Sequence, residues 1–266
     1  MDYKFVNIHP DAKIAQNVVI NPFTSIDKNV IIGEGTTIGS NVTILEGSRI
    51  GKNCRIFPGA VIGGIPQDLK FEGEETTVEI GDNTTLRECV TVNRGTKVTG
   101  KTVVGNNCLL MAYVHIAHDC VLGDNVILSN AVQVAGEVTI GDWAIIGGLA
   151  GVHQFVRVGE HVMVRGGSLV AKDVPPFTKA VRDPIYYAGV NSIGLRRRNF
   201  SNEQIYTIQD CYRILYQSNL NVTNALQKIE AEIAPSKERD DIINFIRDSK
   251  RGIIKGHNAV EEKNDI

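Results

Sequence analysis

The segment IGEGTTIGSNVTILEGSRIGKNCRIFPGAVIGG, residues 32–64, carries an isoleucine at nearly every sixth position. The repeat begins before this segment, and ten isoleucines keep the spacing without a gap: Ile8, Ile14, Ile20, Ile26, Ile32, Ile38, Ile44, Ile50, Ile56 and Ile62. An amphipathic helix needs a period of about 3.6 residues and a half-buried strand a period of about two. A period of six therefore indicates very short strands that are separated by turns.

The residues between the isoleucines support this interpretation. Glycine often follows the aliphatic residue, and Asp or Asn follows the glycine, as in IGKN, IGDN, LGDN and IGDW. These residue types tolerate the positive φ of tight turns. Three hexapeptides make one triangular coil of about 18 residues, which is the hexapeptide form of the parallel β-helix. A β-sandwich of short strands is the alternative, but ten consecutive isoleucines at one spacing favour the β-helix.

Two interruptions of the repeat predict loops outside the coil. The aliphatic positions resume at Ile80, Leu86 and Val92, and then run from Val104 to Val170. Between residues 62 and 80 the sixth positions are Asp68 and Glu74, which cannot line an apolar core without partners. Residues 63–79 are therefore predicted to form a loop. Residues 93–101 suggest a second, smaller excursion, although Val98 within it keeps the spacing of six.

The repeat is predicted to end in the segment DVPPF, because Pro175 and Pro176 would stop strand pairing. Beyond it the pattern becomes helical, and Ser201 with Gln204 makes a possible capping box. Further amphipathic helices are predicted near residues 222–233 and 236–251. The expected organisation is an all-β domain, a parallel β-helix over residues 1–176, followed by a small α-helical region over residues 177–266.

Composition excludes several classes of function. The net charge of −2 gives no reason to expect a nucleic-acid partner. The five cysteines are odd in number and form no CxxC pair, which favours a reduced, cytoplasmic protein with free thiols. The first residues, MDYKFVNIHPDAK, lack the apolar segment of a signal peptide. No apolar run approaches the length of about 18 residues that a transmembrane segment requires.

The segment HIAHDC, residues 115–120, suggests chemistry within the repeat. His118 precedes Gly136 by eighteen positions, so the histidine should lie beneath the glycine, in coils about 4.8 Å apart. This would place a base beside a bare backbone N–H. Acyl transfer needs a base to deprotonate a hydroxyl and a donor for the oxyanion. Asp119 would orient or polarise the imidazole.

Spacing alone leaves two other interpretations open. His115 and His118 flank the inward position Ile116, so both histidines would also suit an ordinary solvated surface. Alternatively, His115 and His118 would bind zinc with His153 as a third ligand, as histidines do in β-helical carbonic anhydrases.

Several motifs taken together resemble the UDP-N-acetylglucosamine acyltransferase family, which opens lipid A biosynthesis. They are HIAHDC, AIIGGLAGVHQF, HVMV, DVPPF and GLRRRNFS, together with PQDLKF at residues 66–71 and VTVNRGT at residues 90–96. The resemblance covers nearly the whole chain. It implies a left-handed β-helix, which departs from the usual right-handed rule for parallel crossovers. It also implies a homotrimer with active sites between subunits.

The implied reaction transfers an (R)-3-hydroxyacyl group from acyl carrier protein to the 3-hydroxyl of UDP-N-acetylglucosamine. No metal or diffusible cofactor is implied, because the acyl group is carried on the phosphopantetheine of the carrier. An alternative is another hexapeptide-repeat acyl- or acetyltransferase that uses acyl carrier protein or coenzyme A. The related N-acyltransferase of the same pathway has an additional N-terminal domain, for which the repeat starting at Ile8 leaves no room.

The resemblance assigns roles residue by residue. It implies His118 as general base, Gly136 as oxyanion donor and Asp119 as an auxiliary. The implied substrate-binding residues are Gln67, Asp68, Lys70, His115, His153, Gln154, Asn191, Arg197 and Arg198. Without the resemblance, the residues of the 63–79 loop would be taken as solvated. The arginine run would be taken as a solvated face or as a docking site for the acidic carrier protein.

Gly166 matches the position that measures acyl-chain length in this family. A glycine there implies a preference for long 3-hydroxyacyl groups, on the order of fourteen carbons, because each excluded methylene changes binding by about 0.8 kcal/mol. The alternative is that Gly166 and Gly167 serve only a tight turn. Departures from the family pattern at Glu137, Pro184 and Ile193 leave the detailed nucleotide contacts open.

Overall fold

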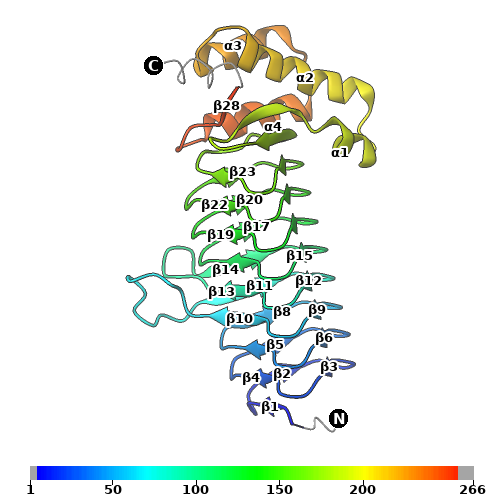
Figure 1. Cartoon of the computed structure of the whole chain (residues 1–266), viewed down its shortest axis with the longest axis vertical. Helices are drawn as coiled ribbons and strands as arrows, with labels where there is room; N and C mark the ends of the chain where they lie inside the picture. The colour runs from blue at the N-terminus through cyan, green and yellow to red at the C-terminus, as the bar shows by residue number, and fades with distance from the viewer. Residues whose placement is uncertain (1–4, 257–266) are drawn as a thin grey trace.

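The computed structural model describes residues 5–256, and in it short strands stack into a three-sided column with helices at its C-terminal end (Figure 1). The strands form three sheets of nine, eight and eleven strands. The first sheet contains β1 (Asn7–Ile8), β4 (Ser25–Ile26), β7 (Thr43–Ile44), β10 (Val61–Gly64), β13 (Thr91–Asn93), β16 (His115–Ile116), β19 (Gln133–Val134), β22 (Gly151–Val152) and β25 (Leu169–Val170). The second contains β2 (Lys13–Ile14), β5 (Ile31–Ile32), β8 (Ser48–Ile50), β11 (Thr77–Ile80), β14 (Lys101–Val104), β17 (Val121–Leu122), β20 (Thr139–Ile140) and β23 (Arg157–Val158). The third contains β3 (Val19–Ile20), β6 (Thr37–Ile38), β9 (Arg55–Ile56), β12 (Thr85–Leu86), β15 (Leu109–Leu110), β18 (Ile127–Leu128), β21 (Ile145–Ile146), β24 (Met163–Val164), β26 (Thr178–Val181), β27 (Tyr186–Val190) and β28 (Lys255–Gly256).

The period of six produces the core of the column, as predicted. Ile8 pairs with Ile26, and Ile26 pairs with Ile44, so equivalent residues lie one coil of eighteen positions apart. Ile26 and Ile44 are fully buried within one continuous apolar cluster. The turns use the left-handed conformation that the sequence suggests, for example at Asn29 and Asn53, where φ is 53° in both cases. The predicted parallel β-helix is therefore confirmed.

Both predicted excursions leave the column (Figure 1), but over residues 65–76 and 94–100 rather than 63–79 and 93–101, because the flanking strands extend further than predicted. Ile50 pairs with Ile80, thirty residues further along the chain, and Ile80 pairs with Val104, twenty-four residues further. The first excursion thus adds twelve residues to a coil and the second adds six. Val98 is 63% exposed, so it does not belong to the core register. It keeps the spacing of six only because the second excursion has the length of one hexapeptide.

Strand pairing does not stop at Pro175 and Pro176, and that prediction is wrong. Val174 forms a parallel bridge with Val158, and β26 then pairs in parallel with β24. The antiparallel strand β27 and the short β28 extend the same sheet further. Both prolines lie in the connection that precedes β26, where the ladder needs no N–H donor from them.

Between β27 and residue 256, four helices follow, and they cover the C-terminal end of the column (Figure 1). They are α1 (Ser192–Arg197), α2 (Asn202–Gln217), α3 (Val222–Glu232) and α4 (Lys237–Arg247). Ser201 and Gln204 form the predicted capping box at the start of α2. α1 was not predicted, because six residues are too few to show a helical period. Within residues 5–256, no helix combines the length and hydropathy that crossing a bilayer requires.

Candidate active site

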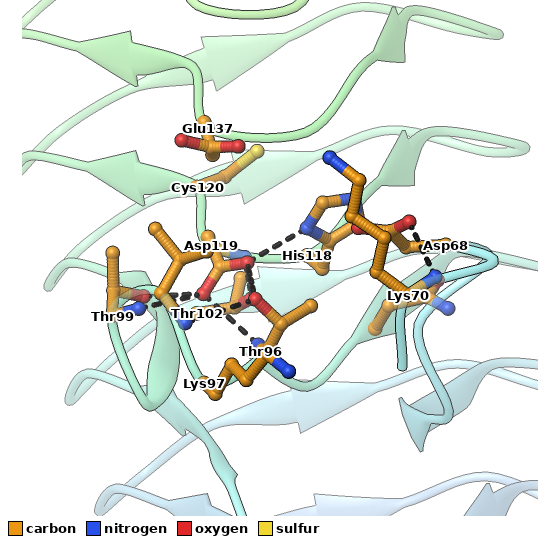
Figure 2. Close-up of polar contacts among 12 residues, drawn as sticks. Asp68, Lys70, Thr96, Lys97, Thr99, Thr102, His118, Asp119, Cys120 and Glu137 are labelled. Atoms are coloured by element: carbon orange, nitrogen blue, oxygen red, sulfur yellow. Dashed lines mark hydrogen bonds and ion pairs between the residues drawn. The ribbon is translucent and has the colours of Figure 1, made fainter. Parts of the chain in front are cut away.

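His118 lies in the turn after β16 and points its imidazole at the carboxylate of the next residue (Figure 2). Nδ1 of His118 is 2.7 Å from Oδ2 of Asp119, and the side chains are only 9% and 0% exposed. An ionised carboxylate only accepts hydrogen bonds, so Nδ1 carries the proton in this contact. In the neutral ring Nε2 is then the unprotonated nitrogen, which is the atom that a general base uses.

The second excursion surrounds Asp119 with donors (Figure 2). Thr96 donates to the carboxylate through its backbone N–H at 3.0 Å and its hydroxyl at 2.7 Å. Thr99 donates through both its backbone N–H and its hydroxyl to Oδ1, the oxygen that also accepts the N–H of Thr96. Burial raises the pKa of Asp119, but the hydrogen bonds from Thr99, His118 and Thr96 outweigh it, and the net pKa is lowered. The carboxylate therefore stays charged beside the imidazole.

These threonines were missed by the sequence analysis. Thr96 and Thr99 belong to the loop over residues 93–101, and Thr102 accepts a hydrogen bond of 2.8 Å from the backbone N–H of Asp119. They precede Asp119 by seventeen to twenty-three positions, which matches no multiple of the repeat. The excursion itself was the only available signal, because loops on rigid scaffolds often carry functional residues.

Gly136 lies one coil above His118, as the coil spacing predicts. The backbone N–H of Glu137 donates to the carbonyl of His118 at 3.0 Å. A Cβ atom on Gly136 would lie 2.6 Å from both Cε1 and Nε2 of the imidazole, so only glycine fits beside this ring. Base and backbone are thus in direct contact.

The turn that holds Gly136 lacks the side-chain acceptor that turns at another corner of the column supply. At the equivalent turn position of another corner of the column, the N–H of Asp124 donates to Oδ1 of Asp142 in the next coil, at 2.8 Å. The residue one coil above Gly136 is Gln154, whose amide instead approaches Glu137 at 3.4 Å. Among residues 5–256 the N–H of Gly136 has no hydrogen-bond partner, although the residue is buried. It is therefore free to donate to a bound oxyanion.

A groove of about 650 Å³ runs along the first sheet beside this pair. Its lining includes Gln67, His115, His118, Gly136, His153, Gln154 and the apolar side chain of Leu169. An adjoining hollow of about 450 Å³ shares Gln67, His118 and Gln154, and adds Asp68, Lys70, Lys97 and Glu137. The structure therefore gathers six of the nine predicted substrate-binding residues around His118.

The first excursion reaches this hollow because the second excursion holds it. The backbone N–H of Lys97 donates to Glu74 at 2.9 Å, and the guanidinium of Arg94 lies 5.4 Å from the ring centre of Phe71. Within the first excursion, Asp68 accepts from the backbone N–H of Lys70 at 2.9 Å (Figure 2). Asp68 and Lys70 therefore belong to an ordered turn that lines the hollow, with the side chain of Lys70 exposed to solvent.

The other two histidines of the groove have local partners. Nδ1 of His115 is 2.7 Å from the hydroxyl of Thr91, and burial lowers the pKa of His115. Nδ1 of His153 lies 3.0 Å from the carbonyl oxygen of Gln154, which can only accept, so Nδ1 carries the proton in this contact. Across the described residues 5–256, no group of three or more His, Cys, Asp or Glu side chains is arranged to hold a metal ion.

The remaining predicted nucleotide contacts lie at the helical end. Asn191 caps α1 with its side chain, Arg197 is exposed, and Arg198 contacts His161. In the described part of a single chain, no contact joins these three residues to the groove at His118. Of the positions that depart from the family pattern, Pro184 and Ile193 are exposed and Glu137 lies in the hollow.

Gly166 lies in the exposed turn between β24 and β25. A Cβ atom there would approach the carbonyl oxygen of Gly148, in the coil below, to 2.9 Å. Gly167, the next residue, has φ +73° and faces open space. The turn itself therefore favours glycine at both positions.

Comparisons with known proteins identify the family. A family model described as UDP-N-acetylglucosamine O-acyltransferase, domain 2, matches residues 173–254, and the bacterial transferase hexapeptide model matches residues 101–136. The acyl-[acyl-carrier-protein]–UDP-N-acetylglucosamine O-acyltransferase of Chlorobaculum parvum is 58% identical over 193 residues, which are 72% of this chain and 73% of the relative. The chain belongs to this family.

Further relatives and solved structures support the family assignment. The enzyme of the same name from Aquifex aeolicus is 58% identical over 198 residues, 74% of this chain and 76% of the relative. The crystal structure of a UDP-N-acetylglucosamine acyltransferase from Bacteroides fragilis is 56% identical, with a TM-score of 0.94, and the match covers 96% of this chain and 100% of that one. The Francisella novicida acyltransferase matches at 41% identity and a TM-score of 0.94, over 98% of this chain and 96% of that one. The expected left-handed β-helix is thereby confirmed.

Proposed function

We propose that this protein transfers an (R)-3-hydroxyacyl group from acyl carrier protein to the 3-hydroxyl of UDP-N-acetylglucosamine, the first step of lipid A biosynthesis. The observation that carries the proposal is the juxtaposition at His118: an oriented imidazole lies against a glycine whose buried N–H has no partner among residues 5–256. The names of the relatives supply the two substrates.

The first step is attack on the thioester. The sugar hydroxyl donates its hydrogen bond to Nε2 of His118, and its oxygen attacks the carbonyl carbon of the acyl group as the proton passes to Nε2. The ring becomes an imidazolium, and the charged carboxylate of Asp119, 2.7 Å from Nδ1, stabilises it. The oxygen of the former carbonyl becomes an oxyanion, and the N–H of Gly136 donates to it.

The second step is collapse of the tetrahedral intermediate. The carbonyl re-forms, the carbon–sulfur bond breaks, and the imidazolium returns its proton to the departing phosphopantetheine thiolate. Base, acid and oxyanion donor are all groups of the protein, so the scheme uses no metal and no diffusible cofactor. His118 ends the cycle in its starting protonation state.

The substrates would approach from different sides of His118. The mainly apolar groove along the first sheet, with Leu169 exposed in it, suits an acyl chain. The hollow with Asp68 and Lys70 suits the polar sugar. Asn191, Arg197 and Arg198 would serve the nucleotide of a neighbouring subunit, since one chain does not bring them to its own groove. We therefore propose a homotrimer with sites between subunits, which acts in the cytoplasm.

The three arginines after Leu195 differ in their surroundings, which suggests a division of work. Arg196 and Arg197 are both exposed, whereas Arg198 is partly buried. Arg196 suits docking of an acidic carrier protein, and Arg197 would join it there in addition to its role at the nucleotide. A partly buried guanidinium with a fixed direction suits a diphosphate, because its planar fork binds phosphate oxygens in pairs.

The test is an acyl-transfer assay with purified protein, UDP-N-acetylglucosamine and a 3-hydroxyacyl carrier protein. We expect turnover by the natural chain and a loss of about 10²–10⁴ in rate for His118→Ala, with the fold preserved. Acyl-coenzyme A or acetyl-coenzyme A as donor forms the second arm. Turnover with coenzyme A thioesters alone would favour the alternative of a coenzyme A-dependent hexapeptide acyltransferase, and near-normal turnover by His118→Ala would exclude His118 as the base.

A further inference from the structure

Arg198 differs from the paired arginines in how its charge is held. Four other arginines form ion pairs with carboxylates: Arg87 with Glu88, Arg213 with Asp210, Arg239 with Asp240, and Arg247 with Glu230. Arg198 has no carboxylate partner within the described residues 5–256. Its guanidinium instead lies 5.1 Å from the ring centre of Trp143, and Nη1 is 3.1 Å from Nδ1 of His161. The cation is held in place without being neutralised.

His161 can hold Arg198 only in one form. A guanidinium nitrogen can only donate, so Nδ1 of His161 accepts, and the proton of the neutral ring lies on Nε2. Burial, the charge of Arg198 and the charge of Lys237 lower the pKa of His161 to about 4. The imidazole therefore stays neutral at ordinary pH. The nearby carboxylate of Glu160 pairs with Lys237 at 3.5 Å, so it does not compete for Arg198.

Aromatic rings fix the His161 imidazole. It stacks in parallel with Trp143, with ring centres 6.4 Å apart, and with Phe177 at 5.7 Å. Phe200 meets it edge-on at 5.0 Å. The backbone carbonyl of His161 accepts from Asn191 at 3.0 Å. Ring and backbone are thus held from several sides, which leaves Nδ1 with one direction in which to accept.

We propose that His161 is a positioning residue for nucleotide binding: with Trp143 it aims the unneutralised guanidinium of Arg198 at the diphosphate of the nucleotide sugar. The inference rests on the proposed function, since that function supplies the diphosphate. A carboxylate in the place of His161 would orient the guanidinium equally well but would cancel the charge that attracts phosphate. A neutral acceptor and an aromatic face orient it and leave the charge available.

Two substitutions separate the acceptor from the ring. His161→Phe keeps the aromatic stack and removes the acceptor, while His161→Asn removes the ring and keeps an oxygen near the place of Nδ1. For His161→Phe we expect the KM for UDP-N-acetylglucosamine to rise about tenfold to a hundredfold, the loss typical of a hydrogen bond to a charged group, with kcat within about threefold. His161→Asn should recover most of this loss. His9→Phe, the same change on an exposed turn of the first coil, is the matched control and should leave both constants unchanged.

Binding can be followed without turnover. Trp143 is the single tryptophan of the chain, and Arg198 lies over its ring. Uridine diphosphate should change the tryptophan emission of the natural chain, and His161→Phe and Arg198→Ala should each raise the Kd. If His161 acts through Arg198, the double variant should bind no more weakly than Arg198→Ala alone.

The outcomes distinguish the two proposals. Absence of acyl transfer by the natural chain would contradict the proposed function, while the binding series would still test the role of His161. A Kd for uridine diphosphate that is unchanged in Arg198→Ala, or that rises in Arg198→Ala but not in His161→Phe, would overturn the inference. If His161→Phe lowers the Tm strongly, the KM of Trp143→Leu provides the second test, because this change removes the aromatic face and leaves the acceptor.

Discussion

Replacing Asp119 with asparagine should stop catalysis by reversing the proton on His118. All five contacts of the carboxylate come from donors, two of them backbone N–H groups on Oδ1. The amide nitrogen of an asparagine cannot face two N–H groups, so it must take the place of Oδ2 beside His118. There it donates to Nδ1, and the imidazole proton moves to Nε2. Nε2 can then no longer accept the proton of the sugar hydroxyl.

The size of the loss follows from the same contact. The charges of the carboxylate and an imidazolium are centred about 4 Å apart, which at an effective dielectric constant of about 20 gives about 4 kcal/mol of transition-state stabilisation. This corresponds to roughly 10³ in rate. The wrong tautomer adds to the loss, as in serine proteases, where the same substitution lowers kcat by about 10⁴. We therefore expect kcat to fall by about 10³–10⁴ with a nearly unchanged KM for the nucleotide sugar.

The assay is steady-state acyl transfer, with the Tm measured on the same samples. Asp142→Asn is the matched control. Oδ1 of Asp142 accepts the backbone N–H of Asp124 in the neighbouring coil, and Oδ1 of Asn106 accepts the N–H of Asp82 in the same way, so an asparagine suits this position. The control should retain activity and a similar Tm. A folded Asp119→Asn protein with a kcat within tenfold of the natural chain would refute the proposed orientation of His118.

Three further changes test other parts of the site. Gly136→Ala should lower kcat by about 10² or more, because its Cβ atom would lie 2.6 Å from the imidazole of His118 and would displace the ring; an unchanged kcat would show that this contact is irrelevant. Gly166→Met should shift the preferred acyl chain toward shorter carrier-bound substrates, with Gly166→Ala as the control for the close approach of a Cβ atom to the Gly148 carbonyl; an unchanged length profile would exclude this position as the ruler. Thr99→Val should cost about 1.5–3 kcal/mol of unfolding free energy at neutral pH. Because the pKa of Asp119 is lower in the folded protein than the unfolded value of about 3.9, its ionised carboxylate stabilises the fold above that pH, and this stabilisation is lost as the pH falls through the folded pKa. Urea titrations should therefore show that the difference in unfolding free energy between Thr99→Val and the natural chain shrinks below about pH 4.

The sequence by itself determined the column and the vertical pairing within it. A strict period of six leaves one arrangement for its isoleucines, because each must stack on the residue eighteen positions away to be buried. The same arithmetic placed His118 beneath Gly136, since neighbouring coils in a parallel β-helix keep a fixed register. The spacing of six was misleading at Val98, which is exposed because an excursion as long as one hexapeptide left the spacing intact. The prediction from Pro175 and Pro176 was also wrong, because sheet pairing resumes after the connection that contains them.

Only the tertiary structure decided what surrounds that register. The donors around Asp119 come from a loop whose path no repeat determines, so their hydrogen bonds depend on how Thr96 and Thr99 fold back over the next coil. The contact between Arg198 and His161 joins a helix end to a turn of the column, 37 positions apart. Periodicity in sequence fixes contacts between coils because their spacing is constant, whereas contacts made by loops and helix ends depend on packing that has no period.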